Sequence, residues 1–125
     1  MNIYIATKNN MVGIALTGDD NNVGFHKAFE TRTNDKEDQV VLGCQRAISF
    51  IVANKLLGAT DTMNIYSDSP VNLDKIHNDE YIKRQGFNFE HKQITTEREK
   101  NAMLTASVEI NMEACRQIIK RSNCR

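Results

Sequence analysis

One short segment, Asn64 to Ile76 with the sequence NIYSDSPVNLDKI, constrains the fold of this chain more than any other. It begins as an apolar strand, ends that strand at a single carboxylate, Asp68, and then starts a helix at once. Ser69 is a favoured N-cap residue, and Pro70 suits the first helical position because its missing N–H would have no partner there. We expect this helix to reach about residue 77. Open α/β sheets place their sites at the carboxyl ends of strands, so the segment predicts an α/β fold with Asp68 at such an end.

The bulk composition predicts one ordinary soluble domain over residues 1–125, with 40% hydrophobic and 26% charged residues. The 16 basic and 16 acidic residues cancel, so the chain lacks the basic excess that nucleic-acid binding usually brings, although a local patch would suffice. Its three cysteines are widely spaced, show no metal-binding pattern and suit a reducing compartment. No apolar run reaches the length of a membrane span. We therefore expect a cytoplasmic protein without a membrane partner.

Alternation of apolar and polar residues predicts three strands within the first 30 residues. Turn-forming residues separate them at Lys8-Asn9-Asn10 and at Gly18-Asp19-Asp20-Asn21-Asn22. Short connections of this kind indicate an antiparallel meander. A fourth strand is expected over Met63–Tyr66 and a fifth from about Phe87 to Lys92.

Helix-capping patterns place the long helices. Asn34 and Glu37 resemble a capping box at the start of a first helix that we expect to stop at Gly58. Thr96 and Glu99 form another capping box before a helix that reaches about Arg121. We expect the buried face of this last helix to carry the apolar side chains Leu104, Val108, Met112, Cys115, Ile118 and Ile119. The order β-β-β-α-β-α-β-α predicts a five-stranded mixed sheet with helices on its faces.

Three segments resemble the ribonuclease H-like superfamily, and together they extend over nearly the whole chain. Ile3-Tyr-Ile-Ala-Thr-Lys8 leads into the meander, and TRTNDKED over residues 31–38 is similar to the family's Thr-Asn-Asn before a helix-borne Glu. Ile65-Tyr-Ser-Asp68-Ser is similar to the family's Tyr-Thr-Asp-Ser. The resemblance implies a ribonuclease H-like fold over residues 1–125. In active members, carboxylates from four places hold two Mg²⁺ or Mn²⁺ ions that promote phosphodiester cleavage.

The resemblance implies acids at two of these four places. Asp68 fills the position after the fourth strand, and the first helix offers Glu37 or Asp38. The family's spacing from Thr-Asn favours Asp38, whereas helical phase puts Glu37 on the apolar stripe that faces the sheet. We choose Glu37, and the choice between the two stays open. A first-turn acid that complements the helix dipole is the alternative role for either residue.

The other two places depart from the family's pattern. The first-strand Asp of the family corresponds to Ala6, which cannot bind a metal, and Lys8 follows nearby. In the last helix, Asn101 and Glu97 lie on the predicted inward stripe, and only Glu97 is an acid. The resemblance therefore implies a degenerate catalytic set in which Asp68 and Glu37 are vestigial or active and Glu97 is a substitute metal ligand. No cofactor would be required, and Mg²⁺ or Mn²⁺ would be needed only by an active enzyme.

Four basic residues are candidate contacts to nucleic-acid phosphates: Lys8, Arg116, Lys120 and Arg121. The last three cluster at the end of the last helix, where favourable interaction with the helix dipole is the alternative explanation.

We therefore expect a non-catalytic ribonuclease H-like binding or regulatory module whose partner is nucleic acid or another protein. Accessory proteins of phages or mobile elements are of this kind. The alternative is a divalent-metal-dependent nuclease that cleaves RNA in hybrids or structured nucleic acid. Cleavage that depends on Asp68 would separate the two hypotheses, and the sequence leaves the oligomeric state open.

Overall fold

A computed structural model of the chain describes residues 1–18, 23–56 and 62–123. The predicted order of elements is confirmed with one addition, because a short helix between the second helix and the fifth strand was not predicted. That helix is capped by Asp79 and ended by Gly86, whose φ is 73°. The elements are β1 (Asn2–Lys8), β2 (Met11–Thr17), β3 (Val23–Glu30), α1 (Lys36–Ala53), β4 (Thr62–Ser67), α2 (Leu73–Asn78), α3 (Glu80–Gln85), β5 (Asn88–His91) and α4 (Glu97–Asn123).

The strands form one mixed five-stranded sheet in the order β3-β2-β1-β4-β5. β1, β2 and β3 are antiparallel neighbours, as the meander predicts, while β4 runs parallel to β1 and β5 runs parallel to β4. In the β1–β4 pair, Ile5 lies beside Ser67. The carboxyl ends of β1 and β4 therefore meet at the same edge of the sheet.

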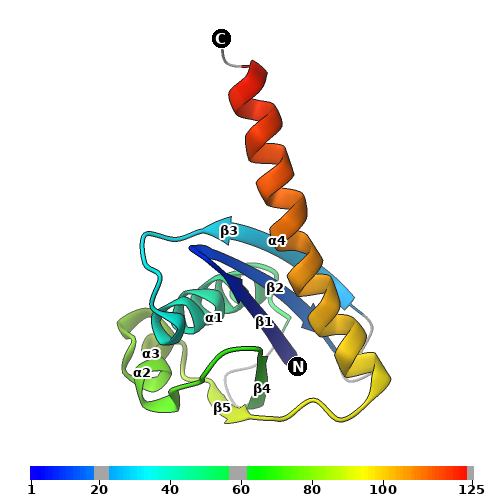
Figure 1. The fold of residues 1–125 in the computed structure, drawn as a ribbon. Coiled ribbons are helices and arrows are strands. Elements are labelled where there is room, and N and C mark those ends of the chain that lie inside the picture. The colour runs from blue at the N-terminus through cyan, green and yellow to red at the C-terminus, as the bar shows by residue number, and fades with distance from the viewer. Residues whose placement is uncertain (19–22, 57–61, 124–125) are drawn as a thin grey trace.

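Helices cover the two faces of the sheet unequally (Figure 1). α1, α2 and α3 lie on one face and enclose the larger core, which is built from aliphatic side chains such as Ile3, Ile5 and Ile48. α4 crosses the other face alone and continues well beyond the sheet. Within the described residues, none of the helices combines the length and apolar character that a membrane crossing requires.

α4 approaches the sheet very closely through small residues. The cluster beneath it includes Ala6, Ala15, Ala102 and Ala106, all almost fully buried. A Cβ atom added to Gly13 would overlap the backbone carbonyl oxygen of Ala106, far inside ordinary contact distance. At Gly13, backbone therefore packs against backbone, and no side chain fits between this point of the sheet and Ala106.

The prediction that the large apolar residues of α4 face inward is wrong. Leu104 and Ile119 are each 60% exposed, and Val108 and Met112 are 43% and 45% exposed. The buried side of α4 instead carries Ala102, Ala106, Glu109 and Ile110. The physical reason is the close approach of the helix backbone to the sheet, which only small side chains permit. Cys115 and Ile118, also expected inside, are likewise exposed.

The helix starts agree with the sequence in part. The capping box at the start of α4 is confirmed, because Glu99 N–H donates to the Thr96 hydroxyl and Thr96 N–H donates to the Glu99 carboxylate. α1 is capped by Asp35, which accepts from Asp38 N–H, rather than by the Asn34–Glu37 box. Similarly, α2 is capped by Asn72, three residues after the expected cap Ser69.

Two turns and one helix end complete the comparison with the sequence. Asn9 has φ 54°, which confirms the turn between β1 and β2. α1 ends at Ala53 rather than near Gly58, and Lys55 adopts the left-handed conformation that ends such helices. Gly58 itself and residues 19–22 of the second expected turn lie outside the described residues.

Candidate functional site

Asp68 lies directly after β4, at the edge where β1 and β4 both end, as the sequence predicts. Its two carboxylate oxygens accept a hydrogen bond from the backbone N–H of Thr7, at 3.1 and 3.3 Å. The Ser69 hydroxyl donates to the same carboxylate at 3.2 Å and lies 2.6 Å from the Thr7 hydroxyl. Asp68 therefore ties the ends of the two strands together while it remains exposed to solvent.

Glu37 and Asp38 both face α2 from the first turn of α1. Asn72 donates to Glu37 at 3.3 Å, and the Lys75 ammonium lies 3.8 Å from Glu37 and 3.0 Å from Asp38. The hydrogen bond to Asp38 raises the pKa of Lys75 above its usual range, so the amine stays charged. Across the residues that the structure describes, no hydrogen bond or ion pair links Asp68 to either acid.

The remaining two family positions hold no acid near Asp68. The β1–β4 register brings Ala6 level with Asp68, but the Ala6 side chain is buried in the cluster beneath α4. Glu97 has an 83% exposed side chain and pairs with Lys100 at 3.3 Å. The substitute metal ligand that the sequence suggested therefore lies in solvent at the start of α4.

The residues present do not fit the two-ion site of active family members. Asp68 and Glu37 are held by different partners, and Ala6 contributes only a methyl group. In the part of the chain that the structure describes, no group of three or more His, Cys, Asp and Glu side chains is arranged to hold a metal ion. No chemical step through a divalent ion follows from this arrangement.

A buried aromatic pair connects the sheet to the start of α4. The rings of Tyr4 and Tyr66 stack with centroids 4.5 Å apart, and the Tyr66 hydroxyl donates to Glu99 at 2.9 Å. The N–H groups of Thr95 and Thr96 also donate to Glu99, at 2.8 and 3.1 Å. These donors, Thr95 first, lower the pKa of Glu99 to about 2. Because both rings are buried, they act as an anchor for α4 rather than as an open stacking surface.

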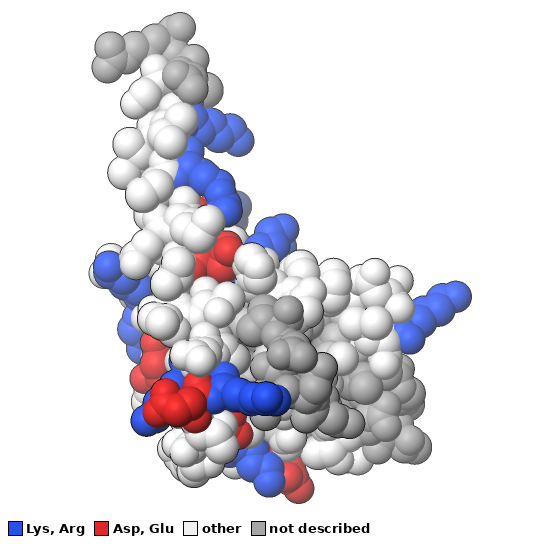
Figure 2. Space-filling view, turned by 90° about the vertical axis from the view of Figure 1, so that its right-hand side faces the viewer, with Lys and Arg blue, Asp and Glu red and all other residues white. Residues whose placement is uncertain are grey.

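The four candidate nucleic-acid contacts lie in different settings. Arg116 is engaged within α4, 2.9 Å from Glu113 and 3.9 Å from Glu109. Lys120 and Arg121 are exposed on the projecting end of α4, where Figure 2 shows basic side chains along one side of the helix. Lys8 is exposed at the end of β1. The structure therefore leaves a small basic group at the tip of α4 and a single lysine on the sheet.

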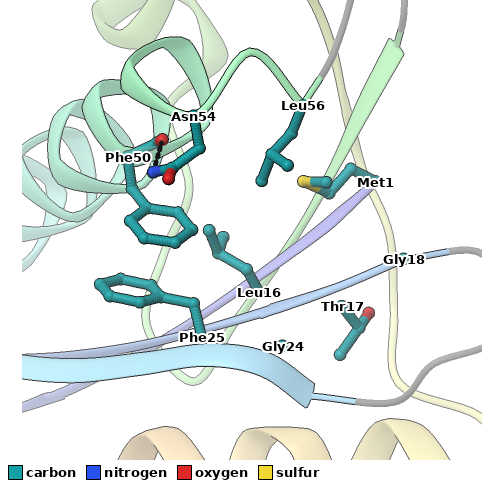
Figure 3. A pocket seen from close by; sticks show the side chains of 9 residues that line it. All are labelled: Met1, Leu16, Thr17, Gly18, Gly24, Phe25, Phe50, Asn54 and Leu56. Atoms are coloured by element: carbon teal, nitrogen blue, oxygen red, sulfur yellow. Dashed lines mark hydrogen bonds between the residues drawn. The ribbon is translucent and has the colours of Figure 1, made fainter.

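An apolar pocket of ≈ 280 Å³ lies at the opposite edge of the sheet, near the beginning of β1 (Figure 3). Phe25 and Phe50 stack at its wall with centroids 3.8 Å apart, and Met1, Leu16 and Leu56 complete its apolar lining. No charged residue is among the described residues that line it. The pocket therefore has no part in the arrangement around Asp68.

No protein-family model matches the chain, and no curated protein does. Among solved structures, RNase H1 from the halophilic archaeon Halobacterium salinarum NRC-1 is similar, with a TM-score of 0.46 and 15% sequence identity. The match covers 89% of this chain and 98% of that chain. The described residues themselves form a mixed five-stranded sheet in the order β3-β2-β1-β4-β5 with helices on its faces, which is the α/β architecture that the sequence predicts.

Two contacts at functional positions were not predicted from the sequence. One is the contact of Lys75 with Glu37 and Asp38, which joins α2 to the first turn of α1 across residues far apart in the sequence. Glu109 is a buried carboxylate with a 7% exposed side chain, and it lies 2.6 Å from His26 of β3. The spacing of Glu109 with Ala102 and Ala106 was the signal for a second, inward face of α4.

Proposed function

We propose that this chain is a non-catalytic ribonuclease H-like module that acts by binding. The observation that carries the proposal is that the candidate catalytic carboxylates already bind protein groups. Asp68 accepts from Thr7 and Ser69, and the Lys75 ammonium lies beside Glu37. A fixed cation next to a carboxylate opposes the approach of a divalent ion. These acids therefore have structural roles at the ends of β4 and α1.

A cleavage assay tests this proposal against the nuclease alternative, which the solvent-exposed position of Asp68 after β4 favours. Purified protein is incubated with a labelled RNA–DNA hybrid in Mg²⁺ and then in Mn²⁺. We expect no cleavage above the level of Asp68→Asn. The matched control is Asp74→Asn, because Asp74 is exposed in the first turn of α2. Cleavage that is lost in Asp68→Asn and kept in Asp74→Asn would establish the nuclease instead.

For the binding partner, we propose nucleic acid contacted by the exposed residues Lys8, Lys120 and Arg121. Support comes from their position on exposed surface and from the absence of acidic partners for these three within the described residues. Arg116 is expected to contribute less, because Glu113 and Glu109 already offset its charge.

Fluorescence anisotropy with single-stranded, duplex and hybrid oligonucleotides at increasing salt measures this binding. Each phosphate contact contributes about 0.7–0.9 to the slope of log affinity against log salt. Lys120→Ala and Arg121→Ala are each expected to lower the slope by about one contact, while Arg116→Ala changes it less. Failure to bind any oligonucleotide even at low salt would exclude nucleic acid and leave a protein partner.

A further inference from the structure

The outer side of α4 carries an unusual concentration of apolar side chains. Among the described residues, five of the seven exposed large hydrophobic residues lie on this one helix. These five residues and Cys115 recur at spacings of three and four residues, which places them on one stripe. This outer stripe consists of Leu104, Val108, Met112, Cys115, Ile118 and Ile119, and it lies opposite the buried residues Ala102, Ala106 and Ile110.

The second half of α4 extends beyond the sheet without covering anything (Figure 1). Figure 2 shows charged side chains along one side of this projecting part and uncharged surface along the other. An isolated helical segment of a few turns is marginal in water without a packing partner. Both the exposed stripe and the projecting turns are features of a helix that packs against another helix.

The surface of α4 contains a shallow hollow of the shape that such a partner fills. Its lining includes Met112, Cys115, Arg116 and Ile119, around a depression of ≈ 350 Å³. Their spacing, i, i+3, i+4 and i+7, is that of a hole that receives one side chain from a facing helix. The hollow is open to solvent and has room for an apolar side chain from such a helix.

We propose that α4 pairs with α4 of a second copy of this chain in an antiparallel dimer. If the two-fold axis passes between Asn111 and Met112, Val108 of each copy enters the hollow of the other. Leu104 then faces Ile119 of the second copy, and Val108 faces Cys115. The same stripe serves both copies, so one surface is complementary to itself, as a two-fold interface requires.

Charge favours a second copy in the antiparallel direction, because the outer stripe carries no charged residue and two such stripes bury no charge when they meet. In a parallel pair, the basic residues Arg116, Lys120 and Arg121 of both copies would gather at the same end of the helix pair, and the two helix dipoles would align. In the antiparallel pair, these basic residues move to opposite ends, and the two helix dipoles oppose each other. Because the stripe faces away from the sheet, the two sheets lie on opposite sides of the helix pair and do not collide.

The dimensions predict a weak rather than a permanent dimer. Leu104 to Ile119 extends over ~22 Å of helix at a rise of 1.5 Å per residue. A contact of this length is at the small end of specific interfaces, which bury about 1,200–2,000 Å² in total. We therefore expect dissociation on dilution in the micromolar range.

Sedimentation equilibrium or light scattering on the full chain, from about 1 to 200 μM, tests the dimer. Met112→Lys places two charges near the two-fold axis and is expected to raise the dimer dissociation constant at least ~10-fold. Val52→Lys is the matched control, since Val52 is 40% exposed on α1 and Met112 is 45% exposed. Circular dichroism checks that both variants stay folded. A wild-type chain that remains monomeric at 200 μM, including one that instead binds phospholipid vesicles, would overturn the proposal.

Directed disulfides test the orientation. In a Cys115→Ser/Cys124→Ser background, Leu104→Cys chains are mixed with Ile119→Cys chains under mild oxidation. A disulfide needs Cα atoms within about 7 Å, so the antiparallel pair predicts covalent dimers in the mixture and none in either variant alone. Covalent dimers of each variant alone, together with a Cys115–Cys115 disulfide in the Cys124→Ser chain, would show a parallel pair and overturn the assignment.

Discussion

Substitution of Gly13 by alanine offers the sharpest test of how α4 sits on the sheet. The added Cβ would overlap the Ala106 carbonyl oxygen, which belongs to helix backbone and cannot rotate away. α4 must then move as a body, and the Tyr66–Glu99 hydrogen bond at its start is disturbed. Overpacking typically costs ~1–3 kcal/mol, and a weakened hydrogen bond adds ~1 kcal/mol. We expect the free energy of unfolding to fall by ~2–4 kcal/mol.

Urea denaturation followed by circular dichroism measures this loss, and two other glycines calibrate it. Nothing lies within 4 Å of a Cβ at Gly24, so Gly24→Ala is expected to leave stability equal or up to ~1 kcal/mol higher. A Cβ at Gly43 would lie 3.1 Å from Ile5 and 3.2 Å from Val12, both methyl groups of side chains rather than backbone atoms, so Gly43→Ala falls between the two. If Gly13→Ala unfolds within 1 kcal/mol of Gly24→Ala, the close packing of α4 described above is refuted.

Three further predictions concern caps and buried charge. Glu99→Gln should remove the pH-dependent part of the stability that the α4 cap provides. In the folded protein the pKa of Glu99 is lowered to about 2 from 4.5. The stability from this carboxylate is therefore present above pH 4.5 and is lost as the pH falls toward 2. Urea midpoints across that range should therefore change less in Glu99→Gln than in the wild type, and equal slopes would contradict the cap. Lys55→Gly should raise the thermal midpoint through a gain of ~1 kcal/mol, because glycine adopts φ 54° without strain; a lower midpoint would be inconsistent with that conformation. His26→Ala should cost ~1–3 kcal/mol by leaving the Glu109 carboxylate poorly paired, whereas Glu109→Met should be nearly neutral; equal losses in the two variants would argue against this account.

Local patterns predicted most of the architecture correctly because strands and helix caps are determined largely by residues that are close in the sequence. The period-two alternation around Ile3 and Ile5, the turn at Asn9 and the Thr96–Glu99 box all depend on neighbours within a few positions. The face of α4 could not be predicted in this way, because it depends on the close contact of Ala106 with Gly13, a residue far away in the sequence.

The candidate site, like the fold, was predictable only where it depends on residues that are close in the sequence. The position of Asp68 at a strand end follows from its own segment, and the structure confirms that position. Its partner Thr7 and the cation beside Glu37 come from distant segments. The start of α2 was also predicted wrongly, because its cap is Asn72 rather than Ser69.

The contact between Gly13 and Ala106 also limits what protein engineering can make of this domain. An acid introduced at Ala6 would replace a buried methyl group in the apolar cluster beneath α4, where desolvation raises its pKa. The small residues on helix and sheet set a short distance between α4 and the sheet. A design that places a metal centre on this face must first replace them with larger residues. That change moves α4 away from the sheet and makes room for a carboxylate.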